Sequence, residues 1–64
     1  MKMLSINEFR KVPLKAKVLI ELFSGTQWVC IVDKVDKNEF HLSNHYFSKL
    51  KVNFGSIASL EIIP

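Results

Sequence analysis

The sequence predicts an all-β protein, in which a short N-terminal helix is followed by five short strands that close as a small barrel. Three observations support this class. The 64 residues allow one domain, residues 1–64. From about residue 15 to residue 63, apolar side chains recur at every second position, which is the period of a strand. Turn residues interrupt this alternation at short intervals, and closing bent strands into a barrel removes exposed edges.

A short helix is predicted at about residues 6–11. Ser5 and Glu8 have the spacing of a capping box, with a hydroxyl at the N-cap and a carboxylate three residues later. Pro13 disfavours a helical conformation in the residue before it, so the helix has to be short.

Two hairpins follow the helix. Strands are expected at residues 15–23, 27–35 and 39–43, joined by a turn at residues 24–26 and a three-residue loop at residues 36–38. The register of the first hairpin is left open, because a tight turn at Gly25 and Thr26 would reverse the face assignment.

The second hairpin indicates which side chains form the core. Its loop length pairs Val32 with Leu42 and Lys34 with Phe40, and we expect His41 to pair with Asp33. One face then carries Trp28, Cys30, Val32, Phe40 and Leu42.

The second strand is apolar on both faces, so its outer face needs a cover. A chain of 64 residues buries too little surface for high stability, and its single cysteine cannot form an internal disulfide. We therefore expect a homo-oligomer. The last two strands are predicted at residues 47–54 and 57–63, with a turn at Gly55 and Ser56.

The order of a short helix and five bent strands resembles the Sm-like family, which includes Hfq and the Sm and LSm RNA-binding rings. The likeness is best over residues 18–44, VLIELFSGTQWVCIVDKVDKNEFHLSN, and over residues 54–64, FGSIASLEIIP. Gly25, Asp36, Asn44 and Gly55 stand at the family's intervals. Generic SH3-like barrels share the same hydrophobic spacing.

The resemblance implies an Sm-like barrel that binds RNA or another single-stranded nucleic acid and forms a ring by edge pairing of its last two strands. The chain departs from the family in both base-contacting segments. Residues 36–39 read DKNE where Sm proteins have Asp-x-Met-Asn, and residues 53–56 read NFGS, without the family's cationic residue.

Charge is compatible with nucleic-acid binding, since the net charge is +3 and the pI is about 9.3. Basic side chains can neutralise phosphates, although a solvated lysine-rich surface is an equally simple interpretation. The candidate nucleic-acid-binding residues are Arg10, Lys11, Lys15, Lys17, Lys37, Asn38, Lys49 and Lys51.

An alternative function is a protein-interaction barrel, such as a phage or mobile-element inhibitor that binds a host protein. Tyr46 and Phe47 are the candidate partner-binding residues, because aromatic side chains dominate interaction hot spots.

We expect no enzyme, cofactor or metal site. Cys30, His41 and His45 are of ligand type, but the cysteine faces the predicted core and the two histidines lie on strand and loop. The longest charge-free run, residues 22–32, is shorter than the roughly 18 residues that a spanning helix needs. We expect a cytoplasmic protein with no membrane partner.

Overall fold

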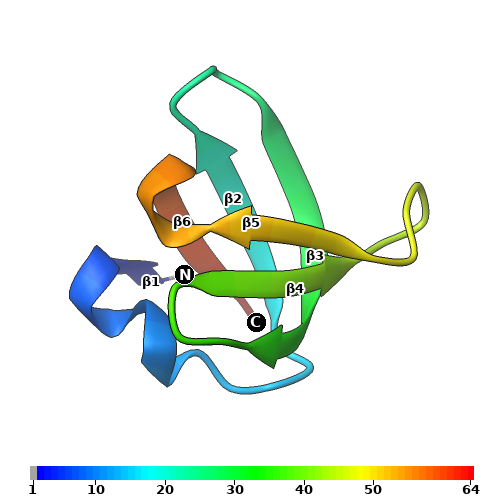
Figure 1. Cartoon of the computed structure of the whole chain (residues 1–64), viewed down its shortest axis with the longest axis horizontal. Helices are drawn as coiled ribbons and strands as arrows, with labels where there is room; N and C mark the ends of the chain where they lie inside the picture. The colour runs from blue at the N-terminus through cyan, green and yellow to red at the C-terminus, as the bar shows by residue number, and fades with distance from the viewer. Residues whose placement is uncertain (1) are drawn as a thin grey trace.

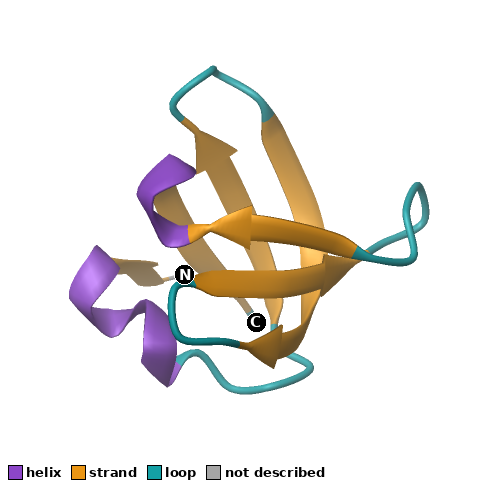
Figure 2. Cartoon of the chain, viewed as in Figure 1, coloured by secondary structure: helices purple, strands orange, loops and turns teal. Residues whose placement is uncertain are grey.

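The computed structural model describes residues 2–64, which form one antiparallel sheet of six strands (Figure 1). The spatial order of the strands is β1-β6-β2-β3-β4-β5. In chain order they are β1 (Lys2–Leu4), β2 (Lys17–Leu22), β3 (Gln27–Val35), β4 (Glu39–Ser43), β5 (Leu50–Asn53) and β6 (Ile57–Ile63). Two 3-10 helices are present, η1 (Ile6–Lys11) between β1 and β2, and η2 (Phe54–Ser56) between β5 and β6 (Figure 2). The predicted all-β class is confirmed.

The helix begins and ends where the sequence predicts. The Glu8 carboxylate accepts hydrogen bonds from the backbone nitrogen and the hydroxyl of Ser5, both at 3.3 Å. At the other end, the Val12 nitrogen donates to the Phe9 carbonyl at 3.2 Å, after which the chain is extended. Phe9 is buried and attaches the helix to the sheet.

Two elements differ from the sequence prediction. The strand expected from residue 47 begins only at Leu50, because the Asn44 side chain accepts hydrogen bonds from the nitrogens of Tyr46 and Phe47 and thereby holds a loop. The three-residue strand β1 was not predicted. It pairs with Leu60 to Ile62 along the outer edge of β6.

The sheet is open but strongly curved. A flat single sheet would be only about 10 Å thick, whereas the chain measures 26 × 25 × 24 Å. In Figure 1, β4 and β5 run across β2 and β6, with the core between them. Within residues 2–64 the strand order ends at β1 on one side and at β5 on the other.

Both hairpins place the apolar residues of one face in this core. Val18 lies opposite Cys30 and Ile20 opposite Trp28, and the nitrogen of Leu22 donates to the Thr26 carbonyl across the loop. This pairing resolves the register that the sequence left open. Within residues 4–64, the buried apolar residues are Leu4, Phe9, Val12, Val18, Ile20, Cys30, Val32, Phe40, Leu42, Val52, Phe54, Ile57 and Leu60.

A bulge in β3 changes the register of the second hairpin. Val32 pairs with Leu42 as predicted, but the register shifts between Val32 and Lys34, so that Lys34 lies opposite His41 instead of Phe40. The predicted pairing of His41 with Asp33 is therefore wrong. An extra residue in one strand reorients the residues that follow it, and sequence alternation alone does not locate it.

Three phenylalanines connect the helices to the sheet. The ring of Phe54 in η2 lies 5.5 Å from that of Phe9 in η1 and 4.7 Å from that of Phe40 in β4. This cluster determines how η1 and η2 sit relative to the β3–β4 loop. Among residues 2–64, no helix has the length and apolar character needed to cross a membrane.

Candidate functional site

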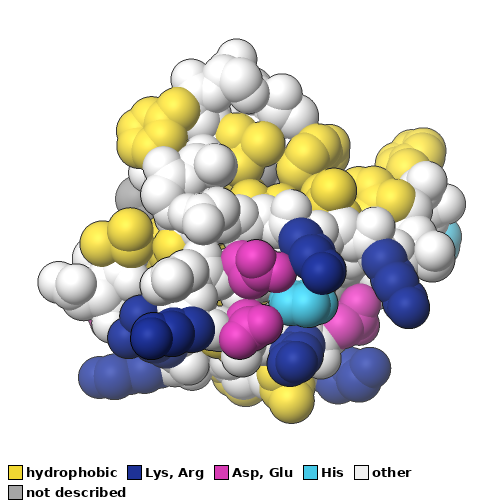
Figure 3. Space-filling view, in the orientation of Figure 1, with side chains coloured by type: hydrophobic (Ala, Val, Ile, Leu, Met, Phe, Trp, Pro, Cys, Tyr) yellow, Lys and Arg dark blue, Asp and Glu magenta, His cyan; other side chains and the backbone are white. Residues whose placement is uncertain are grey.

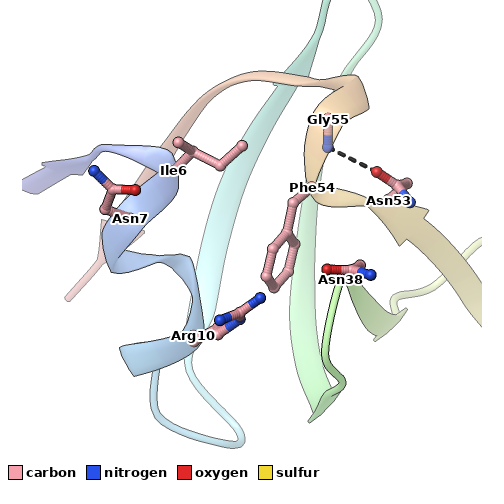
Figure 4. Close-up of a pocket in the computed structure, with 7 residues that line it drawn as sticks. All are labelled: Ile6, Asn7, Arg10, Asn38, Asn53, Phe54 and Gly55. Carbon is pink, nitrogen blue, oxygen red and sulfur yellow. Dashed lines mark hydrogen bonds between the residues drawn. The ribbon is translucent and has the colours of Figure 1, made fainter.

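A groove of about 470 Å³ opens where η1, the β3–β4 loop and η2 meet (Figure 4). It is lined by Ile6, Asn7, Arg10, Asn38, Asn53, Phe54 and Gly55. Three of these side chains are carboxamides and one is a guanidinium, so the groove offers several hydrogen-bond donors and acceptors beside an aromatic ring.

Hydrogen bonds between the three segments set the shape of the groove. The Nε of Arg10 donates to the Lys37 carbonyl at 2.9 Å, which ties η1 to the β3–β4 loop. The nitrogen of Phe54 donates to the Asn38 carbonyl at 2.8 Å, which ties η2 to the same loop. These two bonds hold the groove walls together, and the bond to Lys37 uses Nε of Arg10 rather than its terminal guanidinium nitrogens.

The aromatic side of the groove is only partly available to a ligand. Phe54 is 6% exposed, and its ring points toward the gap between Arg10 and Asn38 (Figure 4). The Asn53 oxygen already accepts from the Gly55 nitrogen at 2.8 Å, so its amide nitrogen is the group left to donate. Such a site favours hydrogen bonding at the edge of a planar polar group over extensive stacking.

The predicted nucleic-acid-binding residues are distributed over several places. Arg10 and Asn38 line the groove, and exposed Lys37 precedes Asn38 in the same loop. Lys11 is exposed in the last turn of η1. These four residues lie on neighbouring segments.

The other four predicted lysines lie outside the groove lining. Lys15 approaches Asp33, with 3.7 Å between the Nζ and Oδ1 atoms. Lys17 lines a different groove, Lys51 lies opposite His41 in the sheet, and Lys49 is exposed before β5. The structure thus separates the predicted set into a part at the groove and a part away from it.

Sequence reasoning missed Ile6, Asn7, Asn53, Phe54 and Gly55 as groove residues. For the last three a signal existed, since residues 53–56 stand where the family resemblance places base contacts. Because that segment lacks the family's cationic residue, the sequence did not predict it to bind. Nothing in the sequence pattern marked Asn7.

Charged side chains surround a histidine on the face shown in Figure 3. Nε2 of His41 lies 3.2 Å from the Glu39 carboxylate and 3.6 Å from that of Asp36. The backbone N–H of Lys37 donates to Asp36 at 2.8 Å and lowers the pKa of that carboxyl, and nearby Lys34 and His41 lower it further.

A second groove, of about 790 Å³, lies over the outer face of β3. It is lined by Lys17, Gln27, Trp28, Val29, Cys30, Ile31, Ser43, Asn44, His45 and Tyr46. No part of residues 2–64 covers Val29, which is exposed, as expected for a strand that is apolar on both faces.

The two predicted partner-binding aromatics differ in their surroundings. Tyr46 is 92% exposed. Phe47 is half-buried and packs edge-on against Trp28, with ring centroids 5.7 Å apart and an interplanar angle of 70°. Phe47 thus has an evident structural role, whereas Tyr46 is accessible to a partner.

Cys30 is buried, as the sequence predicts. Burial, assisted by the negative charge of Asp33, raises the pKa of its thiol to about 11. The thiolate that a nucleophile or metal ligand requires is therefore strongly disfavoured at neutral pH.

Comparison of the chain with protein-family models, with curated proteins and with solved structures gave no match.

Proposed function

We propose that the chain is an Sm-like barrel that binds single-stranded nucleic acid, with RNA as the principal ligand, and that it acts as a small homo-oligomer. The observation that carries this proposal is the groove between η1, the β3–β4 loop and η2. Two of its three walls, residues 36–39 and 53–56, are the segments that the family resemblance associates with base contacts.

The groove has suitable chemistry for an unpaired nucleotide. Carboxamides can hydrogen-bond the edges of a splayed-out base, which is how most single-stranded RNA is read. Arg10 supplies a guanidinium in the groove, and exposed Lys11 and Lys37 stand on the adjoining segments, where they can contact phosphates. We therefore assign the base to Asn38 and Asn53 and the backbone to the three cations.

Fluorescence anisotropy with labelled single-stranded oligonucleotides at low salt tests this assignment. Arg10→Gln should weaken binding and reduce the slope of log K against log salt by about one. Lys17→Gln removes the same charge at the other groove and should leave both quantities nearly unchanged. Equal effects of the two substitutions, or no binding by the native chain, would reject the groove as the nucleic-acid site.

Base contacts can be tested separately. Asn38→Ala should reduce discrimination among homopolymeric oligonucleotides while leaving the salt slope intact, because a carboxamide carries no charge. A change in the salt slope without a change in base preference would instead assign Asn38 to the backbone.

Self-association follows from the uncovered apolar surface. Among the side chains that the structure describes, the exposed large apolar residues are Ile6, Leu14, Phe23, Val29 and Tyr46. The ring geometry implied by the resemblance uses the outer edges of β5 and β6, yet β1 already pairs with Leu60 to Ile62 of β6. We therefore propose edge pairing that involves β5 and either β1 or a β6 from which β1 is displaced. Light scattering that shows a monomer at tens of micromolar protein would reject it.

A protein-interaction barrel is the second candidate function, favoured by the exposure of Tyr46 beside the apolar groove over β3. A pull-down from host lysate, with this chain as bait, tests this candidate. A host-protein partner, for example the target of a phage or mobile-element inhibitor, would stay bound to the chain after nuclease treatment. Tyr46→Ser should abolish its retention, and Phe23→Ser, which alters another exposed aromatic, should not. Recovery of nucleic acid alone would favour the first function.

A further inference from the structure

We propose that Asp36, Glu39 and His41 form a binding site for one divalent transition-metal ion, with Zn²⁺ the preferred ion. None of these three side chains lines either groove, although Asp36 and Glu39 flank Lys37 and Asn38 in the loop that forms one wall of the first groove. The proposal does not rest on the proposed nucleic-acid function. Its ligand atoms would be one carboxylate oxygen from each acidic residue and Nε2 of His41. All three lie within 4.8 Å of one another.

The two distances from Nε2 of His41 to the carboxylate oxygens suit a tetrahedral ion. With bonds of about 2.1 Å to nitrogen and oxygen, two ligands of tetrahedral zinc lie about 3.4 Å apart. Nε2 of His41 is 3.2 Å from Glu39 Oε2 and 3.6 Å from Asp36 Oδ2, on either side of that value. Three protein ligands leave a fourth position for water.

The second observation is a buried nitrogen that contacts two carboxylates but has no hydrogen bond of good geometry. Among the side chains that the structure describes, Nε2 of His41 is the one buried nitrogen or oxygen without a hydrogen-bond partner. Buried polar atoms are normally paired, and each exception needs an explanation. This atom faces two carboxylates, so a cation between them would satisfy the nitrogen and both oxygens at once.

The backbone holds the three ligands in place. Glu39 and His41 are two residues apart on β4 and so project from the same face of the sheet. Asp36 begins the loop before β4, where its other carboxylate oxygen accepts from the Lys37 nitrogen at 2.8 Å and orients the group. The bulge at residue 33 puts Lys34, instead of Asp33, opposite His41.

The ligand set determines the ion and limits its affinity. An imidazole with two carboxylates suits zinc and its first-row neighbours better than Mg²⁺ or Ca²⁺, which prefer all-oxygen sites. Lys34 and Lys51 lie opposite His41 on the two neighbouring strands and oppose a cation. Both lysines are exposed, so water screens them, and we expect micromolar affinity.

Calorimetric titration of the full chain with Zn²⁺ near neutral pH, together with the visible absorption of added Co²⁺, tests the site. We expect one ion per chain and an absorption intensity typical of low coordination number. His41→Gln and Asp36→Asn should each weaken binding more than about tenfold, and Asp36 is exposed, so its substitution leaves the core intact. Lys34→Gln should strengthen binding, because it removes an opposing charge.

The matched control is His45→Gln, which changes the chain's other histidine, an exposed residue outside the cluster. It should leave zinc affinity and the Co²⁺ spectrum unchanged. The proposal is overturned if neither ion binds, if Asp36→Asn and His41→Gln have no effect, or if the His45 variant loses binding to the same extent.

Discussion

Replacing Phe47 by leucine tests whether this aromatic is a structural residue, as its contact with Trp28 indicates. The two rings meet edge-on at 5.7 Å, and such a pair contributes about 0.5–1.5 kcal/mol beyond the area it buries. Leucine has three fewer side-chain carbons. At about 0.8 kcal/mol for each fully buried carbon, and half that for a half-buried ring, their loss costs about 1 kcal/mol. We expect the free energy of unfolding to fall by about 2 kcal/mol in total.

Urea denaturation followed by circular dichroism and by the fluorescence of the single tryptophan, Trp28, measures this change. The m-value should be unchanged, because the surface exposed on unfolding is nearly the same. The control is Tyr46→Leu at the adjacent position, which is 92% exposed and should change stability by less than about 0.5 kcal/mol.

A double-mutant cycle isolates the ring pair. Combining Phe47→Leu with Trp28→Leu should cost less than the sum of the single changes, since the pair can be lost only once. Additive effects would show that the rings do not interact. If Phe47→Leu and Tyr46→Leu destabilise the chain equally, the assignment of a structural role to Phe47 and a free surface to Tyr46 is wrong.

Three further predictions concern the cysteine, the first hairpin and the sheet edge. The Cys30 thiol should react with a disulfide reagent at pH 8 only as fast as the chain unfolds. The pKa of the Cys30 thiol is about 11 in the folded chain and 9.0 in the unfolded chain, so the thiol's contribution to stability should be complete below pH 9.0 and lost as the pH rises toward 11. If Cys30→Ala shows the same pH dependence of stability between pH 9.0 and 11, this prediction is contradicted. Gly25 has a φ of +94°, and a methyl group on its Cα would meet open space. Gly25→Ala should therefore lower the free energy of unfolding by about 1–2 kcal/mol through backbone strain alone, and Gly25→Asn should lower it less. Thermal unfolding measures both changes. Deleting residues 2–4 uncovers the outer edge of β6, and light scattering should then detect larger species than the full chain forms; an unchanged mass would mean that this edge does not limit association.

Alternation of apolar residues was sufficient to place most of the strands. The bounds of β3, β4 and β6 agree with the prediction, and so does the burial of Val32, Phe40 and Leu42. This part is predictable because the side-chain period of a strand is local and one face must leave water. The short helix was equally predictable, since its start depends on Ser5 and Glu8 and its end on Pro13.

The sequence also identified part of the candidate groove. Arg10 and Asn38 were both predicted to bind nucleic acid, and the structure places them on two walls of the same groove. Asn7 and Asn53 could not be assigned to it from spacing, because their proximity depends on the packing of Phe9 and Phe54.

Only the tertiary structure decided the features that depend on partners far apart in the chain. β1 is too short to form alone and exists because β6 offers an unpaired edge. The predicted loop at residues 44–46 extends over residues 47–49, the first part of a predicted strand, because the Asn44 side chain binds its backbone. The bulge at Asp33 also depends on contacts between distant parts of the chain, because it arises from the pairing of β3 with β4 around the core. It places Lys34 opposite His41, and the imidazole of His41 lies beside the carboxylates of Asp36 and Glu39. Residue periodicity states which face a side chain prefers, whereas the register between two strands is set by the whole core that they enclose.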